Sequence, residues 1–283
     1  SKPLASPAVR KCAAELDIDL TLVPASGKAG NITHEDLDTY KKGGTNTRQK
    51  RAGSTEIKVT GMRRIISQRM SESKRHIPHF SYVEAIDMTE IERTRAHLNG
   101  TRAPHQPKLT LMPFFMTAMA KAAKLWPQCN ATFDDDAGVV THHNAVHIGM
   151  AAQTPGGLMV PVIRHAESLD IWALATEIAR LGEAAKAGSV APKELSGSTI
   201  SLTSLGALGG ITATPVINRP EVAILCPNKI VETPVVINGQ VVVRKMMNLS
   251  SSFDHRIVDG FHAAELIAYI KGLLEHPATL FID

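Results

Sequence analysis

The residues best placed for chemistry are His255 and Asp259, which lie four positions apart in the segment SSSFDHRIVDG, residues 250–260. The preceding residues 245–249 are typical of the end of a strand. After the segment, apolar residues recur at helical spacing: Ala263, Leu266, Ile267 and Ile270. Both side chains are therefore predicted on a strand-to-helix turn, where they can face a ligand, and a neutral imidazole there can accept a proton near neutral pH. His34 and Asp38 share this spacing and are assigned no chemistry.

Thr203 and Ser204 offer hydroxyl donors just before a turn that contains Gly206, Gly209 and Gly210. These glycines lack the spacing of a dinucleotide fingerprint, so they predict a tight turn or a wall along which an extended ligand passes close to the backbone. The chain has no Gly-x-Ser-x-Gly turn of a serine hydrolase. A base without a nucleophile of its own suits a substrate that supplies a thiol or hydroxyl, while a hydroxyl donor stabilises the oxyanion. The sequence therefore indicates acyl transfer through a ternary complex.

Three nearby histidines, His142, His143 and His147, suggest a metal site. The local alternation is typical of a strand, however, and four strand steps of about 3.3 Å place His143 and His147 roughly 13 Å apart. We expect surface or core histidines and no metal site.

The composition is that of an ordinary globular protein, with 43% hydrophobic and 20% charged residues among 283. A net charge of +4 gives no argument for binding nucleic acid or membrane, and no apolar run approaches membrane-spanning length. Without an initiator Met or a signal peptide, Ser1 is expected to begin a fragment of a longer protein. Three widely spaced cysteines fit a reducing compartment and argue against a disulfide scaffold: Cys12, Cys129 and Cys226.

Two domains and a linker are predicted. In residues 1–43, Ser6 and Pro7 begin one short helix, and Thr33 with Asp36 resembles a capping box that begins a second. Residues 44–57 are interpreted as a flexible linker, because a nucleic-acid arm would need aromatic residues for stacking. Residues 58–283 mix α and β patterns. Helices are expected from 62 to 70, from 89 to 98 with a capping box of Thr89 and Glu92, from 113 to 126 and from 168 to 187. Strands are expected at 80–86, 146–150, 158–163 and 199–204. Asn238-Gly239 between valine-rich runs is the strongest hairpin signal.

Four sequence blocks occur in order along the chain: residues 127–131, 157–163, 201–224 and 254–260, the second of which reads GLMVPVI and the last DHRIVDG. Together they resemble the dihydrolipoamide acyltransferase component of 2-oxo acid dehydrogenase complexes, over essentially the whole chain. Residues 1–43 are similar to the peripheral subunit-binding domain of that family.

The resemblance implies an α+β fold like chloramphenicol acetyltransferase, a mixed sheet with helices, preceded by a small all-α peripheral subunit-binding domain. It implies homotrimers that assemble into a cubic or icosahedral core, with the active site in a channel between subunits. Coenzyme A would be a substrate, and the acyl group would arrive on a lipoyl group of a lipoyl domain absent from this chain. Residues 1–43 would bind the dehydrogenase/decarboxylase and dihydrolipoamide dehydrogenase components. The protein would lie in the bacterial cytoplasm or the mitochondrial matrix.

By the same resemblance His255 is the general base, and Asp259 supports the site or forms a structural ion pair. Thr203 stands where the family usually has Ser and would stabilise the oxyanion, with Ser204 as the alternative. The candidates for contacts with coenzyme A are Arg95, Thr110, Gln153 and Asn228. Arg10 and Lys11 are the candidates for partner binding. The family usually carries Gly and Arg where this chain has Ala25 and Asn31, which removes a bidentate donor.

Residues 76–82 and 246–253 look most like branched-chain members of the family. Pyruvate, 2-oxoglutarate and acetoin systems stay open as alternatives. Two other classes compete: a stand-alone O-acetyltransferase on the same fold, which would not need residues 1–43, and a non-catalytic binding subunit, which would be expected to lack His255.

Overall fold

The computed structural model describes residues 2–43, 53–154 and 157–282. The chain divides into two compact units, Ser1–Lys58 and Val59–Asp283. Most of the predicted linker 44–57 lies outside the described residues, so its flexibility stays a prediction.

The first unit is a pair of short helices around a small apolar core. Helix α1 (Pro7–Glu15) begins at Ser6, whose hydroxyl accepts from the Val9 amide, and α2 (His34–Lys41) begins with the predicted capping box of Thr33 and Asp36. Between them lies the short 3₁₀ helix η1 (Leu20–Leu22). The buried core consists of Val9, Ala13, Val23, Ile32 and Leu37. Both helix starts were predicted correctly because they depend on adjacent residues.

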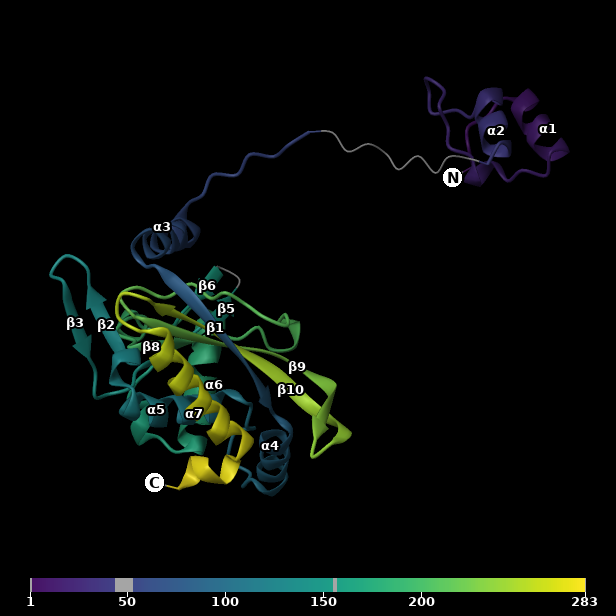
Figure 1. The fold of residues 1–283 in the computed structure, drawn as a ribbon. Helices are drawn as coiled ribbons and strands as arrows, with labels where there is room; N and C mark the ends of the chain where they lie inside the picture. The colour runs from purple at the N-terminus through teal and green to yellow at the C-terminus, as the bar shows by residue number, and fades with distance from the viewer. Residues whose placement is uncertain (1, 44–52, 155–156, 283) are drawn as a thin grey trace. The chain divides into compact units, whose positions relative to one another are not determined.

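The second unit is built on a mixed six-stranded sheet in the order β1-β10-β9-β8-β4-β7 (Figure 1). The antiparallel part consists of β1 (His79–Asp87), β10 (Gln240–Asp254) and β9 (Ala223–Ile237). The sheet continues with β8 (Ile200–Leu202) and β4 (Ile148–Met150), which run parallel to β9, and ends with antiparallel β7 (Val162–Ile163). The predicted mixed α+β class is confirmed.

Two small antiparallel pairs stand beside this sheet: β2 (Ala131–Asp134) with β3 (Val139–His142), and β5 (Ala152–Thr154) with β6 (Gly157–Met159). Five helices complete the unit: α3 (Gly61–His76), α4 (Thr89–Thr101), α5 (Met112–Leu125), α6 (Ile171–Ala187) and α7 (Gly260–Glu275). Helix α7 packs on β1 and on α5, and α5 packs on α6 (Figure 1). Five short 3₁₀ segments connect these elements: η2 (Pro127–Cys129), η3 (Ala166–Ser168), η4 (Pro192–Glu194), η5 (Gly206–Leu208) and η6 (Pro277–Phe281).

The β9–β10 hairpin is the longest element of the sheet and turns at Asn238-Gly239, as predicted. Both turn residues have positive φ, 51° and 77°, which is the backbone that a two-residue type I′ turn requires. The far ends of β9 and β10 are buried, so this hairpin carries the chain from its exposed turn to the predicted catalytic turn after Asp254.

Three details of the predicted elements were wrong. Helix α4 has no side-chain cap, because the Thr89 hydroxyl accepts from the Lys245 amide of β10 at 3.0 Å instead of capping its own helix. The single strand expected at 158–163 is two strands, β6 and β7, which belong to different sheets. The helix expected from 168 begins at Ile171, where Asp170 caps it. Within the described residues, no helix is long and apolar enough to cross a membrane.

Candidate active site

His255 lies on the predicted strand-to-helix turn, between the end of β10 at Asp254 and the start of α7 at Gly260. Its side chain is exposed in this chain. The His255 amide donates to the Pro78 carbonyl at 3.2 Å. The imidazole packs on the Phe80 ring with 4.5 Å between centroids and a 46° tilt. One face of the imidazole is therefore covered by the protein, and the ring stays open to a substrate.

Asp259 immediately precedes α7 and makes no side-chain cap on it. Its carboxylate is 73% exposed, and within the described residues its ion-pair partner is His262 of the same helix, 3.9 Å away. Within the described residues no hydrogen bond or ion pair joins it to His255. The structure thus leaves Asp259 close to His255 in sequence and free to contact a ligand.

Thr203 and Ser204 follow β8 and differ in how their hydroxyls are used. The Thr203 amide donates to the Leu225 carbonyl at 2.9 Å, which fixes its backbone to β9. The Ser204 hydroxyl accepts from the Gly206 amide at 3.1 Å, so it is engaged in its own turn. The Thr203 hydroxyl makes no hydrogen bond to the residues that the structure describes. Thr203 is therefore the better donor to a ligand.

The sheet register separates Thr203 from His255 within one chain. Leu202, next to Thr203, pairs with Leu225 of β9, and Leu225 pairs with Ser251 of β10. From there His255 lies four residues further along β10, in the direction away from Thr203. Because Thr203 lies one step beyond Leu202, five strand steps and two strand spacings separate it from His255, roughly 16 Å along the sheet and about 10 Å across it. One chain does not bring the two side chains together.

The four candidates for coenzyme A contacts fall into three environments. Arg95 on α4 donates to both Glu92 oxygens at 2.9 Å and to the Leu109 carbonyl at 3.4 Å, and Thr110 follows Leu109 as an exposed residue. The structure thus brings Arg95 and Thr110 to one place. Gln153 lies on β5, where its exposed side chain donates to the Thr154 carbonyl.

Asn228 is the fourth candidate, and its side chain is already engaged inside the sheet. Its amide nitrogen donates to the Asn248 carbonyl at 2.7 Å and to the Ser250 hydroxyl at 2.8 Å. It lies where the β9–β10 register shifts between Met247 and Leu249. The Asn228 side chain therefore stabilises this bulge, a structural role that the sequence did not predict.

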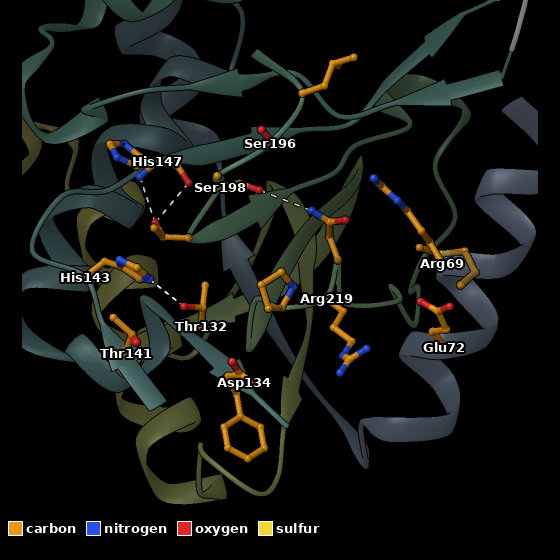
Figure 2. A pocket seen from close by; sticks show the side chains of 17 residues that line it. Arg69, Glu72, Thr132, Asp134, Thr141, His143, His147, Ser196, Ser198 and Arg219 are labelled. Carbon is orange, nitrogen blue, oxygen red and sulfur yellow. Dashed lines mark hydrogen bonds between the residues drawn. The ribbon is translucent and has the colours of Figure 1, made fainter. Parts of the chain in front are cut away.

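A polar cavity of about 680 Å³ opens between α3, β2, β3 and the segments 195–199 and 218–220. Figure 2 shows Arg69 and Glu72 on one side of it, His143 and His147 on the other, and Arg219 between them. The two histidines point to separate partners. His143 Nε2 lies 2.9 Å from the Thr132 hydroxyl, and His147 Nδ1 accepts from the His165 amide at 3.1 Å.

The environment of these histidines disfavours their charged form. Burial lowers the pKa of His147, and the neighbouring His165 and Arg164 lower it further. Burial and His142 likewise lower the pKa of His143. Among residues 2–43, 53–154 and 157–282, no group of three or more His, Cys, Asp or Glu side chains could hold a metal ion.

Glu221, behind this cavity, is a fully buried carboxyl that the sequence did not single out for a role. Its Oε1 accepts from the Ser198 hydroxyl and, at 2.7 Å, from the Asn218 amide. Burial raises its pKa to about 7, although the hydrogen bonds oppose that shift. Two of the three cysteines, Cys129 and Cys226, are also buried: burial raises the pKa of the Cys129 thiol to about 12, so it is no nucleophile near neutral pH.

Two protein-family models match this chain. A family model described as "2-oxoacid dehydrogenases acyltransferase (catalytic domain)" matches residues 51–282, and one described as "e3 binding domain" matches residues 3–38. The chain belongs to the 2-oxoacid dehydrogenase acyltransferase family.

Individual relatives agree with this membership. The chain is 55% identical, over its whole length and 68% of the relative, to the lipoamide acyltransferase component of branched-chain alpha-keto acid dehydrogenase complex of Pseudomonas aeruginosa. Among solved structures, an Azotobacter vinelandii dihydrolipoamide acetyltransferase has a TM-score of 0.78 and 31% identity, covering 81% of this chain and 95% of that one. The cubic core of a pyruvate dehydrogenase multienzyme complex has a TM-score of 0.78 and 32% identity, with the same coverage.

In this acyltransferase, the E3-binding domain carries Arg10 and Lys11 side by side on α1, both exposed. The Arg10 guanidinium donates to the Pro3 carbonyl, which ties the start of the chain to the helix. A side chain at position 27 would collide with that of Asn31, so Asn31 packs within its own loop. Of the four positions weighed from the sequence, Arg10 and Lys11 present a cationic group at the surface.

Proposed function

We propose that this acyltransferase moves a branched-chain acyl group between dihydrolipoamide and coenzyme A, within a 2-oxo acid dehydrogenase complex. The observation that carries the acyl class is the 55% identity to a branched-chain component over the whole chain, against 31% and 32% to the acetyl- and pyruvate-type structures. Pyruvate- and acetoin-type substrates are the alternative.

In the proposed reaction His255 accepts the proton of the attacking thiol, and the sulfur attacks the thioester carbonyl. The Thr203 hydroxyl donates to the oxyanion of the tetrahedral intermediate. When the intermediate collapses, the original carbon–sulfur bond breaks, and the leaving thiolate takes the proton back from His255. The net change is one thioester exchanged for another, without a covalent enzyme intermediate.

The spacing of these residues supports their roles. The Azotobacter vinelandii structure belongs to an investigation of the roles of a serine, a histidine and an asparagine in the catalytic mechanism of that enzyme. Those three residues have the same spacing along that chain as Thr203, His255 and Asp259 have here. The match favours Thr203 over Ser204 as oxyanion donor and gives Asp259 a part in the site.

Because Thr203 and His255 are separated within one chain, the proposed site combines His255 of one subunit with Thr203 of a neighbour. Three large apolar side chains beside Thr203 are exposed and would be covered by that neighbour: Leu205, Leu208 and Ile211. Closed trimers give each subunit one such neighbour on each side. The similarity to a cubic core supports assembly of these trimers into a larger shell.

The E3-binding domain is proposed to hold the dihydrolipoamide dehydrogenase or the decarboxylating component through Arg10 and Lys11. Exposed charges of this kind steer association and are screened by salt. Replacement of Arg10 by Ala should weaken binding of a partner component, measured by calorimetry at two salt concentrations. If wild type and the Arg10→Ala variant bind the partner component with equal affinity at low salt, this assignment is contradicted. The bacterial relatives favour the cytoplasm over the mitochondrial matrix.

The experiment that tests the acyl class is steady-state transfer from a series of acyl-coenzyme A donors to free dihydrolipoamide. We expect isobutyryl and isovaleryl donors to give a higher kcat/KM than the acetyl donor. A preference for the acetyl donor would identify a pyruvate- or acetoin-type enzyme, and transfer to an alcohol in place of the dithiol would identify an O-acetyltransferase.

A further inference from the structure

A ladder of alternating charges lies directly beside His255. The guanidinium of Arg256 donates to both Asp254 oxygens, with Nε at 2.9 and 3.2 Å and Nη2 at 2.6 Å. The Asp254 side chain is 1% exposed. A buried carboxylate of this kind needs its partner in place, because an unpaired buried charge is strongly destabilising. The two residues on either side of His255 in sequence are thus fixed to each other.

The ladder continues to a separate part of the fold. The Arg256 Nη1 bonds to Oδ1 of Asp135, which lies in the turn between β2 and β3. The other Asp135 oxygen accepts from Arg219, with Nε at 2.9 Å and Nη2 at 2.7 Å. The Arg256 guanidinium also lies over the Phe133 ring, 4.6 Å from its centroid. Each oxygen of the Asp135 carboxylate therefore accepts from a different arginine, Oδ1 from Arg256 and Oδ2 from Arg219.

Asp135 remains ionised in this position. Burial raises its pKa, but hydrogen bonds from Arg256 and Arg219 lower it by more, so the pKa lies below the usual range. Planar guanidinium groups suit this arrangement, since each can meet a carboxylate along one edge with two donors. The charges of Asp254, Arg256, Asp135 and Arg219 cancel in sum.

The ladder limits how the His255 backbone can move. The Asp254 amide donates to the Val222 carbonyl at 2.9 Å, and the Arg256 amide donates to the Asp254 carboxylate at 3.0 Å. The His255 ring already rests on Phe80. A displacement of the His255 backbone would therefore strain the bonds from Arg256 to Asp254 and Asp135.

We propose that Asp135 is a positioning residue for the transfer reaction: through Arg256 it holds the turn that presents His255 to the thiol. The inference rests on the proposed role of His255 as the base. Asp135 itself touches no substrate in this account. Its effect belongs to the chemical step, where a small displacement of a catalytic group is costly.

The test compares three variants in the assembled enzyme. Asp135→Asn weakens the bond to Arg256, Asp135→Glu keeps the carboxylate, and Asp136→Asn is the matched control. Asp136 lies in the same turn, is exposed, and has no ion pair within the described residues. Both asparagine variants remove one negative charge, so a general electrostatic effect would appear in both.

We expect kcat of Asp135→Asn to fall roughly 10- to 100-fold with the KM for coenzyme A little changed, because the base is displaced and the binding residues are not. Asp135→Glu should regain part of the loss, and Asp136→Asn should match the wild type. The inference is overturned if Asp135→Asn has the kcat of Asp136→Asn, or if it loses only thermal stability while kcat per folded site is unchanged. If Asp135→Asn does not assemble, Arg219→Gln provides a second test. This variant removes the hydrogen bonds to the other Asp135 oxygen and should lower kcat by a smaller factor. A kcat equal to that of wild type would contradict the proposal.

The same assay with His255→Ala separates this inference from the proposed function. An inactive His255→Ala beside a fully active Asp135→Asn rejects the positioning role alone. An active His255→Ala rejects the proposed function and the inference together.

Discussion

The two halves of the proposed active site differ in how much of their structure one chain supplies. The turn with His255 is held by three contacts within its own chain: Phe80 lies against the ring, Pro78 accepts from the amide, and the buried Asp254 pairs with Arg256. The loop after Thr203 is joined to β9 by two backbone hydrogen bonds, from the Thr203 amide to the Leu225 carbonyl and from the Lys229 amide to the Gly210 carbonyl, and Leu208 between them is 91% exposed.

This contrast separates two requirements of the reaction. A general base must be aimed before substrate arrives, and local hydrogen bonds and ion pairs can do this within one subunit. An oxyanion donor beside a narrow channel also needs a second wall, and exposed apolar groups are suited to receive one. We interpret the His255 turn as prefolded and the Thr203 loop as completed by assembly.

The largest effect is expected at the prefolded half. Replacement of His255 by Ala removes the base and should lower kcat roughly 100- to 10,000-fold. The measurement is steady-state transfer with coenzyme A saturating, on material shown by size-exclusion chromatography to assemble like the wild type. Activity within a few-fold of wild type would assign the base elsewhere.

At Thr203 the effect of the hydroxyl on catalysis can be separated from the effect of the side-chain shape. Thr203→Val keeps the shape and removes the donor, so kcat should fall roughly 100- to 1,000-fold, while Thr203→Ser should retain most activity. Affinity for coenzyme A should change less, since the donor acts on charge formed in the transition state. If Thr203→Val has the same kcat as Thr203→Ser, a backbone amide or Ser204 donates to the oxyanion instead.

The buried Glu221 behind the cavity makes stability depend on pH. Its folded-state pKa of about 7 lies above the ordinary value of 4.5, so between these values the folded chain holds a proton that the unfolded chain has released. Its contribution to stability is therefore largest below about pH 4.5 and falls as pH rises toward 7. Glu221→Gln lacks this titration. Urea unfolding at pH 5 and pH 8, at equal protein concentration, should show a larger loss for wild type than for Glu221→Gln; parallel losses would contradict the raised pKa.

The smallest effect is expected for Ser204→Ala. Its hydroxyl accepts from the Gly206 amide and serves the local turn, so kcat should stay within a few-fold of wild type. The comparison with Thr203→Val under identical conditions checks this, and a loss as large as that of Thr203→Val would exchange the roles of the two hydroxyls.

Local signals in the sequence predicted much of the fold. Ser6-Pro7, the Thr33 capping box and Asn238-Gly239 each specify a helix start or a turn through neighbouring residues, and each is confirmed. The Thr89 capping box failed because a strand 156 positions away takes the hydroxyl. Propensity describes a segment alone, and tertiary contacts override it.

The same limit applies to the candidate site. His255 and Thr203 could be named from the sequence because residue type and nearby turns mark them. Asp135 could not, since its contact with Arg256 spans 121 positions and only the folded β2–β3 turn creates it. The contacts of Asn228 could not be predicted for a related reason: its partners lie on β10, and an Asn that satisfies a bulge looks no different in sequence from one that binds a ligand.

The central claim is that one active site draws His255 and Thr203 from different subunits, and mixed assembly tests it most directly. Inactive His255→Ala and Thr203→Val chains are dissociated, mixed in equal amounts and reassembled, with each variant treated alone as the control. If the two residues come from different subunits, about a quarter of the sites pair an intact His255 with an intact Thr203, and activity should rise toward that fraction of wild type. Mixed particles that form and remain as inactive as the separate variants would show that one chain supplies both residues.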